Sequence, residues 1–273
     1  MPKEYNTIPR NTYAKLIFGG TLLLMLYRLH ATQFLFFIYH QPIKDPTADY
    51  TFWLSLCLYF PQFIINHLWA CLFIDIAVVV VLLAALFSAK NRHLYARLFL
   101  FFFFIQRITL ETFSCSHVKS VTCIFAAILP FCVKDDETFD LLVDFGRYLL
   151  AYILLSAAYH KFTNGALFAS NNFAHQLVNQ HIDLATLYPT HISYKIAAYL
   201  ITHPLLATIM YKLLFLSQVV FVTAFFTKKF DKILFVFVFA FAVNTYFIMR
   251  IYNFDLALLS MCLFYFKAKN KTS

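Results

Sequence analysis

Long, nearly uninterrupted runs of apolar residues are the feature that most constrains this chain. Eight such runs alternate with short polar breaks, at residues 14–38, 64–88, 94–113, 118–134, 140–162, 196–226, 231–249 and 253–267. A helix needs about 20 apolar residues to cross a bilayer, and continuous apolar runs favour helices over barrel strands. The sequence therefore predicts an all-α, polytopic integral membrane protein: a helical bundle of about eight membrane segments, with the fourth and eighth short.

The amino-acid composition excludes a soluble globular protein. Of the 273 residues, 62% are hydrophobic, 35 are Phe and only 13% are charged. Soluble domains are about 45–50% apolar, and one soluble domain of this size has no interior large enough for so many apolar side chains. We therefore expect the lipid bilayer to cover much of the surface. No internal repeat or linker divides the sequence, so residues 1–273 are predicted to form a single domain.

The distribution of basic residues predicts the orientation. With the N-terminus inside, thirteen Lys and Arg residues fall on the inner side and five on the outer side. This is the positive-inside pattern, and it predicts that both termini are cytoplasmic. The formal net charge of +9 is spread over short clusters between apolar runs. No basic patch supports a nucleic-acid partner.

Several charged or amide side chains interrupt the apolar runs. Such a side chain is costly in hydrocarbon and is a functional candidate by default. The predicted binding residues are Arg28, His30, Asp75, Arg107, Glu111 and Asn244. Arg107 with Glu111, and Asp144 with Arg147, are each about one helical turn apart, so each pair could orient its helix or belong to a site.

Arg28 and His30 have no acid within a turn on their own segment. We therefore expect their partners to come from another helix, such as Asp75 or Glu111, or from a ligand. The result would be a polar centre built from the first three membrane segments.

In the stretch "LLSAAYHKFTNGALF", residues 154–168, Tyr159, His160 and Lys161 lie at the end of the fifth segment. Asn164 and Gly165 then interrupt the helical pattern. A lysine at a helix end commonly extends its ammonium into water along an apolar surface. Three consecutive residues cover most of a helix circumference, so at least one of these side chains must face protein. A lysine removed from water loses its proton more readily and can act as a base. The sequence leaves both interpretations of Lys161 open.

Cysteine and histidine spacing predicts no metal site. The histidines at 175, 181 and 191 form no i,i+4 pair and have no thiolate nearby. Cys115 and Cys123 flank the turn between the third and fourth segments. They could form a disulfide on an oxidising outer side, or be two small buried apolar residues.

The order of segments resembles the HTTM family, the membrane domain shared with vitamin K-dependent γ-carboxylase. The resemblance rests on "YILLSAAYHKFTNGALF", on the first segment "LIFGGTLLLMLYRL" and on the closing pair "VFAFAVNTYFIMRIYNFDLALLSMCLFYF". It departs from the family at Gln218 and Asn244, where Glu and His are common. The resemblance implies that Lys161 is the base that acts on a quinone-like cofactor. It also implies a short member without the carboxylase's extramembrane domain, in a bacterial inner membrane.

Two functions follow as hypotheses. In the first, the protein is a carboxylase-like or oxidoreductase-like membrane enzyme with an outward-facing polar pocket for a quinone-like molecule, or it matures a secreted peptide. Lys161 would then be the base, with Tyr159 and His160 as supporting groups, and the polar loop 163–195 would be a lid. In the second, it is a non-catalytic membrane subunit or maturation partner of a secreted peptide or a periplasmic thiol-disulfide protein. A transporter is disfavoured, because the two halves show no matching pair of helices broken by Gly or Pro.

Overall fold

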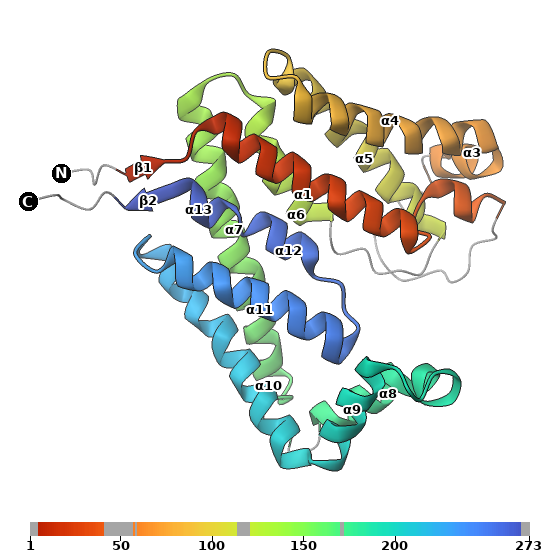
Figure 1. Ribbon diagram of the computed structural model, residues 1–273, viewed down its shortest axis with the longest axis vertical. Coiled ribbons are helices and arrows are strands. Elements are labelled where there is room, and N and C mark those ends of the chain that lie inside the picture. Colours follow the sequence, from red (N-terminus) through yellow and green to blue (C-terminus); the bar gives the residue numbers. More distant parts are fainter. Residues whose placement is uncertain (1–4, 41–56, 58, 114–120, 170–171, 269–273) are drawn as a thin grey trace, which may run out of the picture. The chain divides into compact units, whose positions relative to one another are not determined.

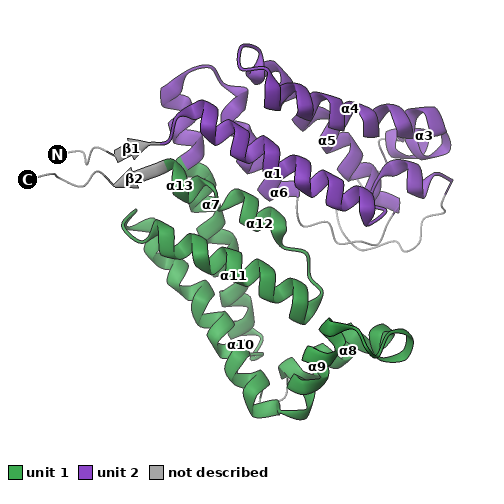
Figure 2. Cartoon of the chain, in the orientation of Figure 1, with its two compact units in different colours: residues 1–7, 144–273 green, residues 8–143 purple. Residues whose placement is uncertain are grey.

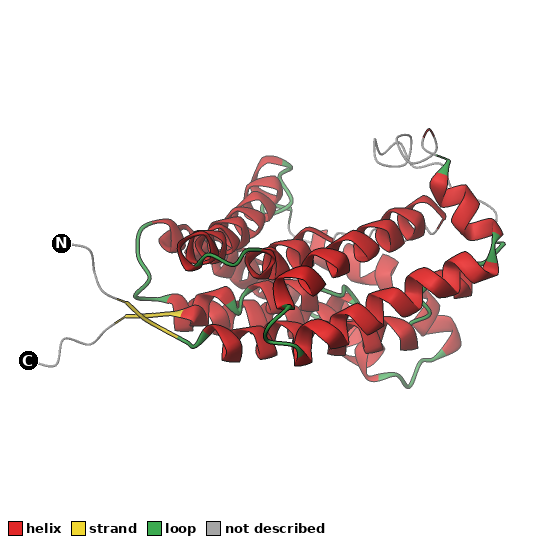
Figure 3. Ribbon diagram, turned by 90° about the horizontal axis from the view of Figure 1, so that it is seen from above, coloured by secondary structure: helices red, strands yellow, loops and turns green. Residues whose placement is uncertain are grey.

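The computed structural model describes residues 5–40, 57, 59–113, 121–169 and 172–268, and nearly all of them are helical (Figures 1 and 3). The helical fold class predicted from the sequence is thus confirmed. The chain forms two compact units (Figure 2). Unit 1 comprises residues 1–7 and 144–273, and unit 2 comprises residues 8–143.

Within the described residues, six helical stretches are long and apolar enough to cross a membrane. They are Arg10–Ile38, Leu68–Phe87, Arg92–Phe113, Asp136–Thr163, Pro204–Phe225 and Asp231–Met249. The predicted fourth and eighth segments correspond to the shorter apolar helices Val121–Cys132 and Phe254–Tyr265. The protein is therefore built as a multi-pass membrane protein, and its number of crossings depends on how those two short helices sit in lipid.

Unit 2 contains the first half of the helical elements. They are α1 (Arg10–His30), the 3₁₀ helix η1 (Leu35–Ile38), α3 (Phe60–Asn66), α4 (Leu68–Phe87), α5 (Arg92–Phe113), α6 (Val121–Ile128) and the 3₁₀ helix η2 (Leu129–Cys132). The helices α4 and α5 pack along each other. One apolar core gathers Leu35 of η1, Ile64 of α3, Cys71 of α4 and Leu110 of α5. Pro130 stands at the start of η2, where it cannot continue the hydrogen-bond ladder of α6.

Unit 1 contains most of α7 (Asp136–Thr163), a helix whose first eight residues belong to unit 2. Its other elements are α8 (Asn172–Leu187), α9 (Ile192–Thr202), α10 (Pro204–Val219), the 3₁₀ helix η3 (Val220–Phe225), α11 (Asp231–Met249), α12 (Phe254–Leu259) and α13 (Cys262–Tyr265). A core of Phe173, Leu177, Leu200, Tyr211 and Ile248 joins α8, α9, α10 and α11.

The prediction that residues 163–195 form a loop is wrong. The chain there folds into α8 and the start of α9. The buried side chains of α8 are Phe173, Ala174, Leu177, His181 and Leu184. Their spacing gives one apolar face with a period near 3.6 residues, which the many polar residues between them obscure in the sequence.

The predicted sixth segment, 196–226, is two helices rather than one. Its break lies at His203, whose φ of −122° and ψ of 68° leave the helical region just before Pro204. Proline disfavours helical geometry in the residue before it and is itself well suited to the first helical position. Pro204 therefore ends α9 and starts α10.

Two left-handed backbone positions fix the ends of membrane helices in unit 1. The predicted break at Asn164 and Gly165 is confirmed, since α7 ends at Thr163 and Gly165 has a φ of +67°. At the end of α11, Arg250 has a φ of 55°, and the N–H of Ile251 donates to the Thr245 carbonyl at 3.0 Å. This closing geometry is usually formed by glycine, so an arginine held there carries some backbone strain.

Two short strands near the two ends of the described chain lie side by side. The strands β1 (Tyr5–Thr7) and β2 (Phe266–Ala268) pair antiparallel, with Asn6 opposite Lys267. Residues 5–7 and 266–268 therefore meet at one place, as expected if both termini are on one side of a membrane. That this side is the cytoplasm stays a prediction.

Candidate functional site

Lys161 reaches from α7 to α10. Its Nζ donates a hydrogen bond to Oε1 of Gln218 at 2.7 Å, and Gln218 is buried. The same Nζ lies over the Tyr211 ring, 5.6 Å from the ring centre, and makes a cation–π contact with it. Of the two interpretations left open by the sequence, the structure places Lys161 against protein. Its polar partner is a neutral amide rather than a carboxylate.

The other two residues of the predicted catalytic group point elsewhere. Tyr159 is 70% exposed, and His160 is also exposed and receives a hydrogen bond from the Asn164 amide at 2.9 Å. Successive helical residues are rotated by about 100°, so the face of α7 that carries Lys161 to Gln218 turns its neighbours outward. The structure therefore does not bring Tyr159 or His160 to the Lys161 amine.

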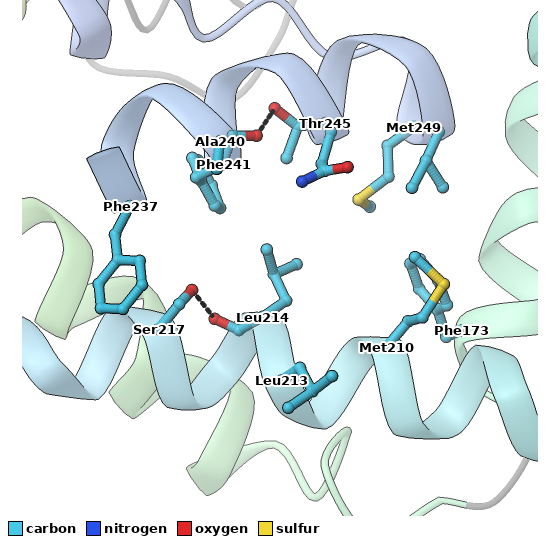
Figure 4. Close-up of a pocket in the computed structure, with 12 residues that line it drawn as sticks. Phe173, Met210, Leu213, Leu214, Ser217, Phe237, Ala240, Phe241, Thr245 and Met249 are labelled. Carbon is cyan, nitrogen blue, oxygen red and sulfur yellow. Dashed lines mark hydrogen bonds between the residues drawn. The ribbon is translucent and has the colours of Figure 1, made fainter. Parts of the chain in front are cut away.

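A cavity lies between α10 and α11, with α8 closing one end. It has a volume of about 240 Å³ and is lined mainly by apolar side chains. Figure 4 shows Met210, Leu214 and Ser217 of α10 facing Phe237 and Met249 of α11, so that the two helices run in opposite directions along it. Both walls belong to helices that are long and apolar enough to span a membrane.

Few polar groups line this cavity, and most of them are already engaged. The Ser217 hydroxyl donates to the Leu214 carbonyl at 2.7 Å, and the Thr245 hydroxyl donates to the Phe241 carbonyl at 2.9 Å. Asn244, predicted as a binding residue, also lines the cavity, and its amide makes no hydrogen bond to the described residues. An apolar cavity with one available amide is the usual composition of a small-molecule site.

The cavity and Lys161 meet through one aromatic pair. Phe173 of α8 lines the cavity and stacks on Tyr211, with ring centres 5.3 Å apart. On α10 the cavity residues Met210, Leu213, Leu214 and Ser217 share one face, and Tyr211 and Gln218 lie about 100° round the helix. The Lys161 amine therefore sits beside the cavity wall, behind Tyr211.

The residues of the predicted polar centre lie in unit 2. Asp75 on α4 accepts a hydrogen bond from the Gln106 side chain of α5 at 2.7 Å and from the Phe36 N–H of η1 at 3.0 Å. This buried carboxylate thus ties η1 and α5 to α4. Gln106, the direct partner of Asp75, was not among the predicted binding residues.

The remaining predicted residues of unit 2 differ in exposure. Arg28 is buried, with its guanidinium carbon 5.7 Å from the centre of the Phe103 ring of α5. His30, two residues on, is exposed at the end of α1. Arg107 is buried and Glu111 half-buried on α5. Arg28 therefore lies against another membrane helix, whereas His30 does not enter the interior.

Asp144 and Arg147 do not form the predicted local pair. Arg147 donates to Asp231 at the start of α11, with Nη2 at 3.0 Å from Oδ1, and both side chains are almost fully buried. Asp144 accepts from Lys228 at 2.6 Å. The two residues share a face of α7, but that face meets the segment 227–231, which supplies closer partners.

The polar part of unit 1 outside the membrane-spanning helices contains a buried histidine. His181 on α8 is 1% exposed, its Nδ1 lies 3.0 Å from the Leu177 carbonyl, and its Nε2 has no hydrogen-bond partner among the described residues. Burial lowers the pKa of His181 below its ordinary value. Nearby on the surface, Arg250 forms an ion pair with Asp183, and this hydrogen bond holds the pKa of the Asp183 carboxyl below its usual range.

Within the described residues, no three His, Cys, Asp or Glu side chains gather as a metal site would require. The predicted disulfide involves Cys115, which lies outside the described residues, so the pairing of Cys115 with Cys123 stays a prediction. No family model, curated protein or solved structure matches the chain in the comparisons made with known proteins.

Proposed function

We propose that this multi-pass membrane protein binds a lipid-soluble, quinone-like molecule in the cavity between α10 and α11. The observation that most directly supports this proposal is the available Asn244 amide in a cavity lined mainly by apolar side chains. The two helices that form the cavity are apolar enough to span a membrane. A quinone ring would bury its faces against Phe173 and Phe241, and the amide would donate to one ring carbonyl. The HTTM resemblance favours the same ligand class and is part of the proposal.

The size of the cavity supports a bound ring with an external tail. Pockets that enclose drug-sized molecules have volumes of about 300–1,000 Å³, whereas this cavity has about 240 Å³. It would therefore hold the ring of a quinone and leave an isoprenoid tail in the lipid beside α10 and α11, where Leu213 and Phe239 are exposed.

The binding proposal is tested with a photoreactive short-chain quinone in proteoliposomes, followed by peptide mapping. We expect crosslinks on α10 and α11, and we expect Ala240→Phe, which fills the cavity, to abolish them. Val236→Phe is the matched control, since Val236 lies one turn earlier on α11 and does not line the cavity. Crosslinking that survives Ala240→Phe, or that is lost equally in both variants, would contradict the proposal.

A chemical role for Lys161 is the second candidate function. It is favoured by the neutral partner of this lysine, because an amide neither neutralises the ammonium nor prevents proton loss. The Tyr211–Phe173 pair would then connect the amine to a ligand in the cavity. In this proposal Lys161 is the base of a carboxylase-like or oxidoreductase-like enzyme.

Labelling distinguishes this role from a purely structural contact. A lipid-soluble amine-reactive probe is applied with and without the quinone, and modification of Lys161 is compared with that of the exposed Lys212 on α10. Protection of Lys161 alone by the quinone would support the base. Equal modification of Lys161 with and without quinone would leave it as a contact between α7 and α10. The alternative of a non-catalytic maturation partner would then be preferred.

A further inference from the structure

A cleft at one end of unit 2 collects basic side chains from three separate parts of the sequence. It has a volume of about 370 Å³, and its basic lining residues are Arg10, Lys90, Arg92, His93 and Lys134. Arg10 begins α1, Lys90 lies in the connection between α4 and α5, and Lys134 follows η2. Arg92 and His93 are the first two residues of α5. Residues more than 120 positions apart thus face the same space.

The two guanidinium groups are held in place by hydrogen bonds. Arg10 donates from Nη1 to the Lys134 carbonyl at 3.0 Å and from Nη2 to the Val133 carbonyl. Arg92 donates from Nε to the Ala85 carbonyl at 3.0 Å and from Nη2 to the Asn11 side chain at 2.9 Å. A guanidinium has five N–H donors, so Arg92 keeps donors for a further acceptor. The cleft is therefore preorganised.

The positive charge of the cleft is only partly compensated. Asp136 pairs with Arg10 at 2.7 Å, and this carboxylate is otherwise exposed to solvent. Asp135 accepts from the Thr138 N–H at 2.7 Å and is thereby engaged at the start of α7. Hydrogen bonds from the Thr138 side chain and then from its N–H hold the pKa of Asp135 below its ordinary value. The exposed Lys90 and Lys134 add two further cations. The cleft therefore has an excess of positive charge.

The helix ends add to this charge. Both α1 and α5 begin at the cleft, with Arg10 and Arg92 as their first residues, and neither helix has an acidic residue in its first turn. The N-terminal ends of helices carry a partial positive charge and unsatisfied N–H groups that bind anions such as phosphate. Fixed guanidinium groups, exposed ammonium groups and helix ends thus favour the same kind of ligand.

The surroundings of the cleft identify the source of the anion. The cleft lies where the membrane-spanning stretches Arg10–Ile38 and Arg92–Phe113 begin and next to the end of Leu68–Phe87. Phe87 at that end is 80% exposed and Leu94 is 49% exposed, so apolar surface continues from the cleft along the helices. Basic pockets between membrane helices suit the headgroups of anionic lipids. We propose that this cleft binds the phosphate headgroup of an anionic phospholipid, with the acyl chains lying along α4 and α5.

The proposal is tested by lipid titration of the purified full-length chain in neutral detergent, read by native mass spectrometry. Phosphatidylglycerol, phosphatidylcholine and inorganic phosphate are titrated separately. We expect retained phosphatidylglycerol and weak phosphatidylcholine binding. The variant Lys90→Gln/Lys134→Gln should raise the Kd for phosphatidylglycerol about 25-fold, at about fivefold for each basic residue near an anionic group.

The matched control is Lys229→Gln/Lys232→Gln, which removes the same charge from exposed lysines of unit 1. Both pairs are exposed, so neither variant should disturb folding, and a thermal unfolding scan checks this. An equal loss in the control, or equal affinity for phosphatidylcholine, would overturn the proposal. Inorganic phosphate that displaces phosphatidylglycerol at equal concentration would also overturn it, because the site would then belong to a soluble anion.

Discussion

The buried ion pair between Arg147 and Asp231 is the contact whose loss should harm the protein most. It joins the middle of α7 to the start of α11, and the two side chains are 2% and 4% exposed. Arg147 also donates to the Thr227 carbonyl at 2.5 Å. Replacing Asp231 by Ala would leave a guanidinium buried without its carboxylate.

The magnitude follows from this burial. Removing one partner of a buried ion pair costs about 3–5 kcal/mol, since the remaining charge is uncompensated. Asp144 lies three residues before Arg147 on α7 and would partly replace Asp231, so the cost for Asp231→Ala should be near 3 kcal/mol. The neighbouring pair of Lys228 and Asp144 has side-chain exposures of 14% and 30%. Lys228→Ala should therefore cost no more than about 1 kcal/mol.

The assay is reversible unfolding in mixed micelles, followed by circular dichroism, for four proteins. These are the wild type, Asp231→Ala, Lys228→Ala and the double variant Arg147→Met/Asp231→Leu. The double variant removes both charges together and should recover most of the lost free energy of unfolding, because no buried charge remains unpaired. A cost below 1 kcal/mol for Asp231→Ala, or a double variant as unstable as the single one, would refute the reasoning.

Three further predictions concern other polar contacts. Asp75→Leu should lower the free energy of unfolding by about 1–3 kcal/mol, because it leaves the buried Gln106 amide unsatisfied; Asp75→Asn should cost less, and equal losses would argue against the contact. His181 has a lowered pKa, so the stability it contributes is present above about pH 6.5 and is lost as the pH falls; thermal scans of wild type and His181→Leu should diverge below that pH. Asp183 also has a lowered pKa beside Arg250, so the stability it contributes is present above about pH 4 and is lost on acidification. The protection of the α8 amides against hydrogen exchange in Asp183→Asn at pH 7 should resemble that in the wild type at low pH.

The fold class and most boundaries of the membrane segments could be predicted from the sequence. Apolar run length dictates helices in lipid, and the α7 end at Gly165 follows from the conformational freedom of glycine. The helix α8 was missed because its apolar face is narrow and is interleaved with amides and histidines. A helix can be predicted from the local sequence pattern only where the period of its apolar residues stands out from the polar residues around them.

The polar contacts were much less predictable. Gln218 stood out in the sequence as a departure from the HTTM family, and nothing in the sequence pairs it with Lys161, 57 residues earlier. Likewise, the one-turn spacing of Asp144 and Arg147 predicted a local pair, whereas the structure gives each a partner near residue 230. Spacing along one helix identifies which side chains share a face. Which helix packs on that face depends on tertiary structure.

Two cations on α7, Arg147 and Lys161, differ in the groups that they contact. Arg147 and Lys161 are about 21 Å apart along the helix axis. Arg147 has a carboxylate and a backbone carbonyl as partners, so its charge is compensated and its role is to fix α7 to α11. Lys161 has an amide and an aromatic ring, which orient the amine without neutralising it. Its net charge can still be balanced by an incoming anion or removed by loss of a proton. If one cation of α7 takes part in ligand chemistry, this contrast in partners makes it Lys161, and Gln218→Glu should suppress that chemistry by giving Lys161 the carboxylate that Arg147 already has.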